Sequence, residues 1–207
     1  MAEIERSVKD LTWRGGPARA IVTTRQYNTH IEDLWDAIVN PERLQRWFGV
    51  VTGNLTEGGQ YQIEGNAHGT IETCTKPSHL SLTWEANGGI GWLLVSLEAI
   101  EQNNTQLRLE HIARDDEELR TFWAQFGPGA LGVGWDISLD GLVQYLATGE
   151  APDSADENWW TGTEAGKTSI RASSKGWVEA AIAFGEPKEA AETAGQTTYN
   201  FYTGSEG

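Results

Sequence analysis

The side chain with the best prospects for chemistry is His111, close to the end of a predicted strand. Leu107, Leu109 and His111 share one face of this strand, because side chains alternate between faces every two residues. A neutral imidazole on a covered face can orient a ligand or move a proton. A core histidine bonded to a neighbouring hydroxyl or carbonyl would show the same pattern. His111 is therefore a candidate ligand-binding residue and a candidate acid or base, and we assign no catalytic residue beyond this candidate.

Aromatic residues are the second candidate group, since the chain has ten Trp among 207 residues. Taken singly, each Trp suits simple core packing. Taken together on a fold that encloses space, large apolar side chains can line a ligand pocket. The candidate ligand-binding set is Trp47, Trp84, Trp92, His111, Trp135 and Leu139.

Several other chemistries lack their sequence signatures. The four histidines do not have the spacing that places two on one helix face, as zinc sites of the helical kind require. The single cysteine, Cys74, and the serines have no nucleophile-elbow setting. The glycine-rich run at 127–134 does not follow a strand in the phosphate-binding pattern. We expect no metal and no nucleotide or other cofactor.

Charge and composition restrict the partners. A formal net charge of −15 argues against nucleic acid, which requires clustered cations, and against anionic membrane surfaces. The charged start of the chain does not resemble a signal peptide, and no segment approaches the roughly 20 apolar residues of a membrane span. One cysteine suits a reducing compartment. We expect a soluble cytoplasmic protein that does not act on nucleic acid or membranes.

The hydrophobic pattern predicts the elements that position these residues. It indicates a strand at 18–27, an amphipathic helix that Thr29 and Glu32 would cap, and a second helix that starts at Asn40-Pro41 and stops at Gly49. Six strands separated by short turns follow, and short connections favour an antiparallel sheet. Helices are predicted at 115–126 and at 133–148, the latter closed by Gly149. A long helix along a curved sheet encloses a cavity.

The chain divides into three parts. Residues 1–17 are a polar extension, residues 18–149 form the main domain, and residues 150–207 are a linker and a helical tail. In the linker, the pair Trp159-Trp160 is a candidate for docking on the domain. The tail is too small to fold alone and should pack on the domain or on a second subunit, with Trp177 and Phe184 on its apolar face.

Five motifs, in the right order, resemble the START-like (SRPBCC) superfamily, and within it the branch named for activators of the heat-shock-protein-90 ATPase. They are Arg25-Gln-Tyr27 with Leu34-Trp35-Asp-Ala37-Ile38, the run from Asn40 to Phe48, the strand from Leu80 to Glu85, the strand from Thr105 to His111, and the helix from Gly134-Trp135 to Leu146. The resemblance implies an α+β helix-grip fold, with a curved antiparallel sheet wrapped around a long C-terminal helix and a hydrophobic cavity between them. Extra C-terminal helices and the segment at 115–132 depart from the usual pattern.

The leading hypothesis is a domain that binds a small hydrophobic or amphipathic ligand in this cavity, as the resemblance implies for a superfamily that includes lipid, sterol and polyketide binders. A second hypothesis is an enzyme of the polyketide cyclase or hydrolase kind that uses His111. A third is a protein-interaction module, either chaperone-associated or a homodimer formed through the tail.

Overall fold

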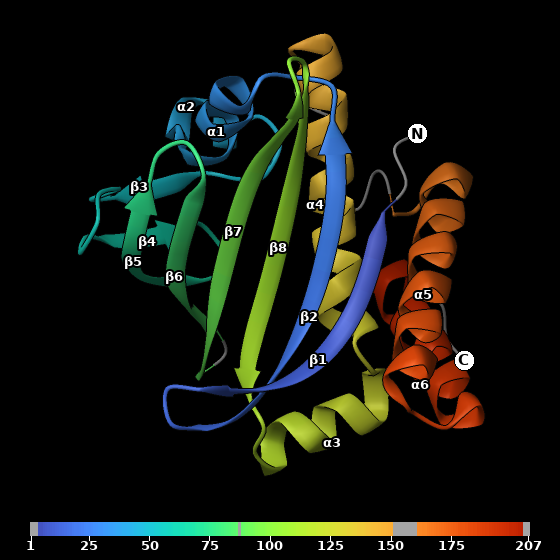
Figure 1. Ribbon diagram of the computed structural model, residues 1–207. Coiled ribbons are helices and arrows are strands. Elements are labelled where there is room, and N and C mark those ends of the chain that lie inside the picture. The colour runs from blue at the N-terminus through green and yellow to red at the C-terminus, as the bar shows by residue number, and fades with distance from the viewer. Residues whose placement is uncertain (1–3, 87, 151–160, 205–207) are drawn as a thin grey trace.

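The computed structural model describes residues 4–86, 88–150 and 161–204. One antiparallel sheet of eight strands runs in the order β1-β2-β8-β7-β6-β5-β4-β3 (Figure 1). The strands are β1 (Glu5–Trp13), β2 (Gly16–Tyr27), β3 (Val51–Gly53), β4 (Gln60–Ile63), β5 (His68–Thr75), β6 (His79–Ala86), β7 (Gly89–Glu101) and β8 (Asn104–Arg114). The helices are α1 (Ile31–Val39), α2 (Pro41–Leu44), α3 (Glu117–Phe126), α4 (Gly129–Thr148), α5 (Glu164–Phe184) and α6 (Lys188–Thr203).

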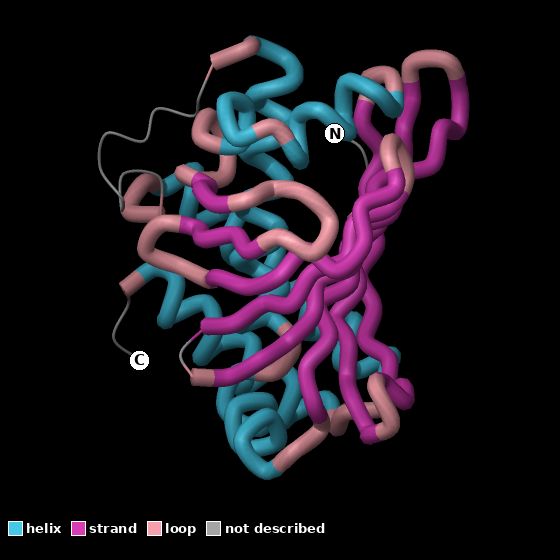
Figure 2. Tube along the Cα trace, turned by 90° about the vertical axis from the view of Figure 1, so that its left-hand side faces the viewer, coloured by secondary structure: helices cyan, strands magenta, loops and turns pink. Residues whose placement is uncertain are grey.

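The sheet curves, and most of the helical segments lie on one side of it (Figure 2). Helix α4 runs along this side, which we call the inner face, and its Leu139 and Leu142 are buried there. The helix ends at Gly149, whose φ of 73° is the left-handed conformation that glycine adopts without strain. The predicted α+β helix-grip fold, with extra C-terminal helices, is confirmed.

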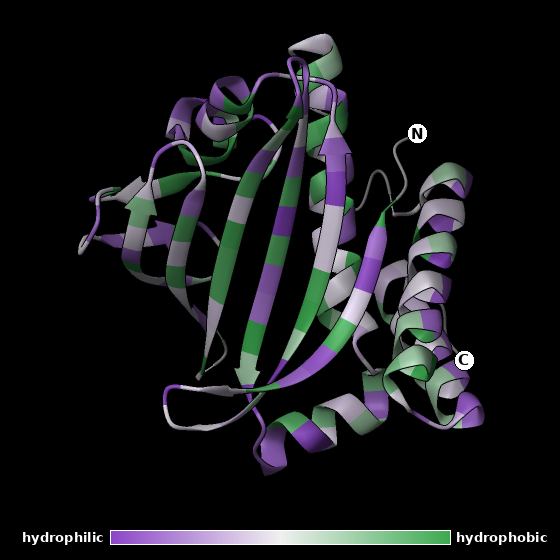
Figure 3. Cartoon of the chain, viewed as in Figure 1, coloured by the Kyte–Doolittle hydropathy of each residue, from purple (hydrophilic) through white to green (hydrophobic). Residues whose placement is uncertain are grey.

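Strand β7 is apolar along most of its length, whereas β8 alternates between hydrophobic and hydrophilic residues (Figure 3). Leu93 and Val95 of β7 belong to the main core cluster beneath α4. Trp92 points to the opposite, outer face, where the ring of Trp13 lies 6.1 Å away. Both faces of β7 are therefore covered, as its continuous apolar run predicts.

Helices α1 and α2 show one correct and one wrong capping prediction. Asn40 caps α2, because its side chain accepts a hydrogen bond from the Glu42 backbone N–H. The capping box expected from Thr29 to Glu32 is wrong. His30 is the N-cap residue of α1. The Thr29 hydroxyl instead donates a hydrogen bond of 2.7 Å to the Asp33 carboxylate. Helix α2 also ends at Leu44, earlier than predicted.

Two element boundaries differ from the sequence-based expectation. Strand β1 lies inside the polar stretch 1–17 and pairs along its whole length with β2. Helix α4 begins at Gly129, about one turn before the predicted start. Both differences arise where polar or glycine-rich residues weaken the hydrophobic pattern that sequence reading depends on.

The C-terminal helices pack on the main domain. Trp177 of α5 is 1% exposed and lies against Gly132 of α4, where a side chain on Gly132 would overlap the indole. Ser173 and Trp177 both donate to Asp136 of α4. The face that carries Trp177 is therefore covered by the chain itself. The pair Trp159-Trp160 lies outside the described residues.

None of the helices in the described ranges has the length and apolar character needed to cross a membrane.

Candidate functional site: an apolar cavity beside His111

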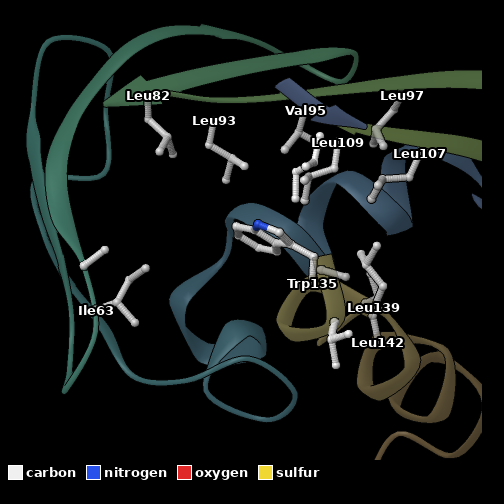
Figure 4. Packing of buried hydrophobic residues seen from close by; sticks show 14 of the residues in the cluster. Ile63, Leu82, Leu93, Val95, Leu97, Leu107, Leu109, Trp135, Leu139 and Leu142 are labelled. Carbon is white, nitrogen blue, oxygen red and sulfur yellow. The ribbon is translucent and has the colours of Figure 1, made fainter. Parts of the chain in front are cut away.

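A cavity of about 120 Å³ lies between the inner face of the sheet and α4. Side chains from both layers point into the space, with Trp135 projecting toward the sheet (Figure 4). The sheet contributes Tyr61, Ile63, Ile71, Cys74, Leu80, Leu82, Trp84, Leu93, Val95, Leu107 and Leu109. Helix α4 contributes Trp135 and Leu139, and the segment from α1 to the residues after β3 contributes Ile38, Val39, Leu44, Trp47, Phe48, Val51 and Leu55.

Three polar atoms of this lining, on Tyr61, Trp47 and Trp135, donate hydrogen bonds to partners in the protein. The Tyr61 hydroxyl donates to the Thr83 carbonyl at 2.7 Å, and the Trp47 indole N–H donates to the Ala37 carbonyl at 3.0 Å. Burial raises the pKa of the Tyr61 hydroxyl and of the Cys74 thiol above their ordinary values, so both stay protonated at neutral pH. The cavity therefore offers apolar contact to an occupant.

Aromatic rings form one end of the cavity. Phe48 stacks on Trp135 with ring centroids 6.0 Å apart and planes only 8° from parallel. Trp47 lies beside Phe48 at 5.4 Å, and Trp84 meets Trp135 edge-on at 5.2 Å. The turn after α2 thus joins the first helices to α4 through stacked rings, and it forms one wall of the cavity.

Four of the six residues predicted to bind ligand line this cavity, namely Trp47, Trp84, Trp135 and Leu139. Trp92 does not. It lies on the outer face with Ala18, Ala20, Val22 and Ile112, because its position in β7 alternates with those of Leu93 and Val95. That alternation is visible in the sequence, but the unbroken apolar run of β7 conceals which face each residue takes. Leu107 and Leu109 are lining residues that the alternation of β8 indicated without singling out, whereas Leu93 and Val95 of β7 were not identified from the sequence.

His111 also lies outside the cavity lining, behind the ring of Trp135. The Trp135 indole N–H donates to His111 Nδ1 at 3.1 Å. An indole nitrogen is only a donor, so Nδ1 must carry the lone pair and Nε2 must carry the proton. Burial lowers the pKa of His111 to about 4, which keeps the ring neutral at neutral pH.

The proton on Nε2 limits the acid or base chemistry that His111 can perform. The outward nitrogen, Nε2, has a proton and no lone pair, so it cannot abstract a proton while the Trp135 bond persists. If it gave up that proton, it would leave an imidazolate. His111 is thus arranged to donate a hydrogen bond, and the geometry does not favour its use as a general base. Among the described residues, no group of three or more His, Cys, Asp or Glu side chains is placed to hold a metal ion.

Comparison with known proteins agrees with this architecture. The chain resembles the crystal structure of CalU16 from Micromonospora echinospora, with 30% identity over 71% of this chain and 88% of that chain and a TM-score of 0.61. The solution structure of the same protein matches at 25% identity over 99% of this chain and 95% of that chain, with a TM-score of 0.63, so the likeness includes the C-terminal helices. Protein MLL2253 from Mesorhizobium loti, at 20% identity over 62% of this chain and 97% of that chain and a TM-score of 0.54, shares the fold.

No curated protein sequence matches the chain. A family model described as "Activator of Hsp90 ATPase homolog 1-like protein" matches residues 28–147, which covers α1 to α3, the sheet from β3 onward and nearly all of α4, but not α5 and α6. The chain therefore belongs to the activator of Hsp90 ATPase homolog 1-like family, within the SRPBCC superfamily.

Proposed function

We propose that this protein binds a small, uncharged, apolar molecule in the cavity between the sheet and α4. The observation that carries the proposal is the cavity itself, about 120 Å³ of space lined almost wholly by aliphatic and aromatic side chains. A packed interior normally leaves few voids larger than a water molecule. A void of this size beneath the main helix therefore supports a role in binding.

The volume indicates the size of the occupant. An engineered apolar cavity of about 150 Å³ stays dry and binds benzene or xenon. The cavity here is similar, so one aromatic ring, or a short branched alkyl chain, is the expected scale of the part that is enclosed. A charged group would lose its hydration without gaining an ion partner, and this cost excludes ionised ligands from the interior.

A homologous series of alkylbenzenes tests the proposal. Calorimetric titration with benzene, toluene, ethylbenzene and propylbenzene should show affinity that rises until the cavity is full and then stops rising. Each enclosed CH₂ contributes about 0.8 kcal/mol, which is roughly a fourfold gain in affinity. The absence of saturable binding by every member of the series would overturn the proposal.

Neighbouring positions of β7 provide a matched pair of variants. Val95→Phe replaces an isopropyl group by a benzyl group that fills the cavity, and it should abolish binding, because Val95 is part of the lining. Leu94→Phe adds the same ring at the next residue but on the outer face, where Leu94 packs beside the cluster around Trp92, and should leave binding unchanged. Equal effects of the two substitutions would show that the ligand is held elsewhere.

A further inference from the structure

We propose that a second recess, at the β8 carboxyl end of the inner face, is a separate site for an uncharged ligand with a carbonyl oxygen. In this site the Nε2–H of His111 donates a hydrogen bond to that oxygen. The proposal does not depend on the function proposed for the apolar cavity, since the two spaces have different linings, with Trp84 common to both.

Small residues on adjacent strands create the recess. Ala86 of β6 pairs with Gly89 of β7, and Gly91 of β7 pairs with Ala113 of β8. Along the same strands, the main cavity has leucines on the inner face. The missing side-chain volume leaves a recess of about 290 Å³. Helices α3 and α4 border its open side with the apolar side chains of Leu119, Phe122 and Leu131.

A buried hydrogen-bond donor faces this space. His111 is 6% exposed and its Nδ1 is occupied by the Trp135 indole. Its Nε2 lies 3.1 Å from the point that a Cβ on Gly91 would occupy, so it faces the gap left by that glycine. No described residue accepts a hydrogen bond from Nε2. Nε2 opens onto the recess, where water can reach it, so a ligand oxygen that replaces this water keeps the hydrogen bond while the apolar walls contact the rest of the ligand.

The charges around the recess favour an uncharged ligand that accepts a hydrogen bond. The rim carries the exposed side chains of Arg114, Asp116 and Glu118. Asp116 also accepts the backbone N–H of Leu119 at 2.9 Å and so fixes the start of α3 at the rim. Two carboxylates beside one guanidinium give an anionic ligand no net attraction, and the neutral imidazole N–H repels a cation. Apolar walls with a single neutral donor suit an aryl ketone or a similar carbonyl compound.

The test compares acetophenone with α-methylstyrene, which has the same shape but a CH₂ group in place of the carbonyl oxygen. Protein labelled with ¹⁵N at histidine reports the Nε2 resonance of His111. Acetophenone should shift this resonance saturably, and α-methylstyrene should bind roughly tenfold more weakly, as expected for the loss of one hydrogen bond. An unmoved Nε2 resonance, or equal binding of the two compounds, would overturn the proposal.

Three variants locate the interaction. His111→Asn keeps an acceptor oxygen near the Trp135 indole, but its shorter side chain places no N–H at the position of Nε2, so acetophenone should lose its preference over α-methylstyrene. Ala113→Leu keeps His111 and fills the recess, so the acetophenone-dependent shift should disappear. Val95→Phe blocks only the apolar cavity, and the shift should persist. Loss of the shift in Val95→Phe with retention in Ala113→Leu would place acetophenone in the cavity and refute the second site.

Discussion

The indole N–H of Trp135, on α4, donates a hydrogen bond of 3.1 Å to Nδ1 of His111, on β8. This contact ties the long helix to the sheet at the point where the apolar cavity ends and the second recess begins. It also sets the tautomer of the imidazole, because an indole cannot accept. A buried polar pair in which both atoms are satisfied can specify how two elements dock, and here it fixes the depth of α4 over β8.

The first prediction concerns pH. His111 has a pKa of about 4 in the folded protein, lowered from 6.5 by burial. Below pH 6.5 the unfolded chain takes up a proton at this residue and the folded protein does not, so the unfolding free energy falls as the pH is lowered from 6.5 toward 4. The full difference corresponds to about 3 kcal/mol. Urea denaturation across this range measures it.

The matched variant for this experiment is His111→Asn, which cannot titrate. Its unfolding free energy should lack this part of the pH dependence, while all other groups titrate as before. The gap between the native chain and the variant should therefore narrow as the pH falls from 7.5 to 4.5. A gap that is constant with pH would contradict the buried, neutral state of His111.

The second prediction concerns Gly132, where α4 meets α5. A Cβ at this position would overlap the Trp177 indole, so Gly132→Ala should destabilise the protein by about 1–3 kcal/mol, despite the better helix propensity of alanine. Thermal unfolding of the single variants and of the double variant with Trp177→Phe checks the cause. The smaller phenyl ring relieves the overlap. The double variant should therefore lose less unfolding free energy than the sum of the losses in Gly132→Ala and Trp177→Phe. Strict additivity would contradict the contact.

The third prediction concerns Asp136, a carboxylate buried within α4. Its Oδ2 accepts from Arg6 Nε at 2.8 Å and from Trp177 Nε1 at 3.0 Å, so one residue joins β1, α4 and α5. Burial raises the pKa of Asp136, and the Arg6 charge opposes this increase. Asp136→Ala leaves the guanidinium without its partner and should cost about 3–5 kcal/mol. Denaturant titration measures this loss.

An exposed ion pair of α5 serves as the control for Asp136. Lys175 and Glu179 lie 3.8 Å apart, and both side chains are largely exposed. Glu179→Ala should therefore change the unfolding free energy by no more than about 0.5 kcal/mol. A loss at Glu179 similar to that at Asp136 would mean that burial is not what makes the Asp136 network important.

The fourth prediction distinguishes the two faces of the sheet. Trp84 lines the cavity and Trp92 lies on the outer face, so Trp84→Leu should change alkylbenzene affinity while Trp92→Leu should not. Both substitutions remove a large buried or half-buried ring and should lower stability by a few kcal/mol. Calorimetric titration at a temperature where both variants are folded separates binding from stability. Altered affinity in Trp92→Leu alone would contradict the assignment of faces.

The sequence alone determined the features that depend on local backbone chemistry. Asn40 and Pro41 start α2, Gly149 ends α4, and the alternation in β8 places Leu107 and Leu109 on the inner face. Each of these follows from the conformational preferences of a few adjacent residues or from the period of a strand. Together with the five family motifs, they were sufficient for the fold.

Tertiary structure decided the features that depend on pairing between distant residues. Strand β1 is polar, and it joins the sheet because it pairs with β2 and because Arg6 donates to Asp136. The hydropathy pattern of β1 does not predict either contact. The sequence does not show on which face of the sheet Trp92 lies. Strand β7 is covered on both faces, so the residues on its two faces do not differ in hydropathy. The lone pair and the proton of His111 were assigned only when α4 brought Trp135 against it, because a side chain's hydrogen-bond partner is set by packing and not by sequence spacing.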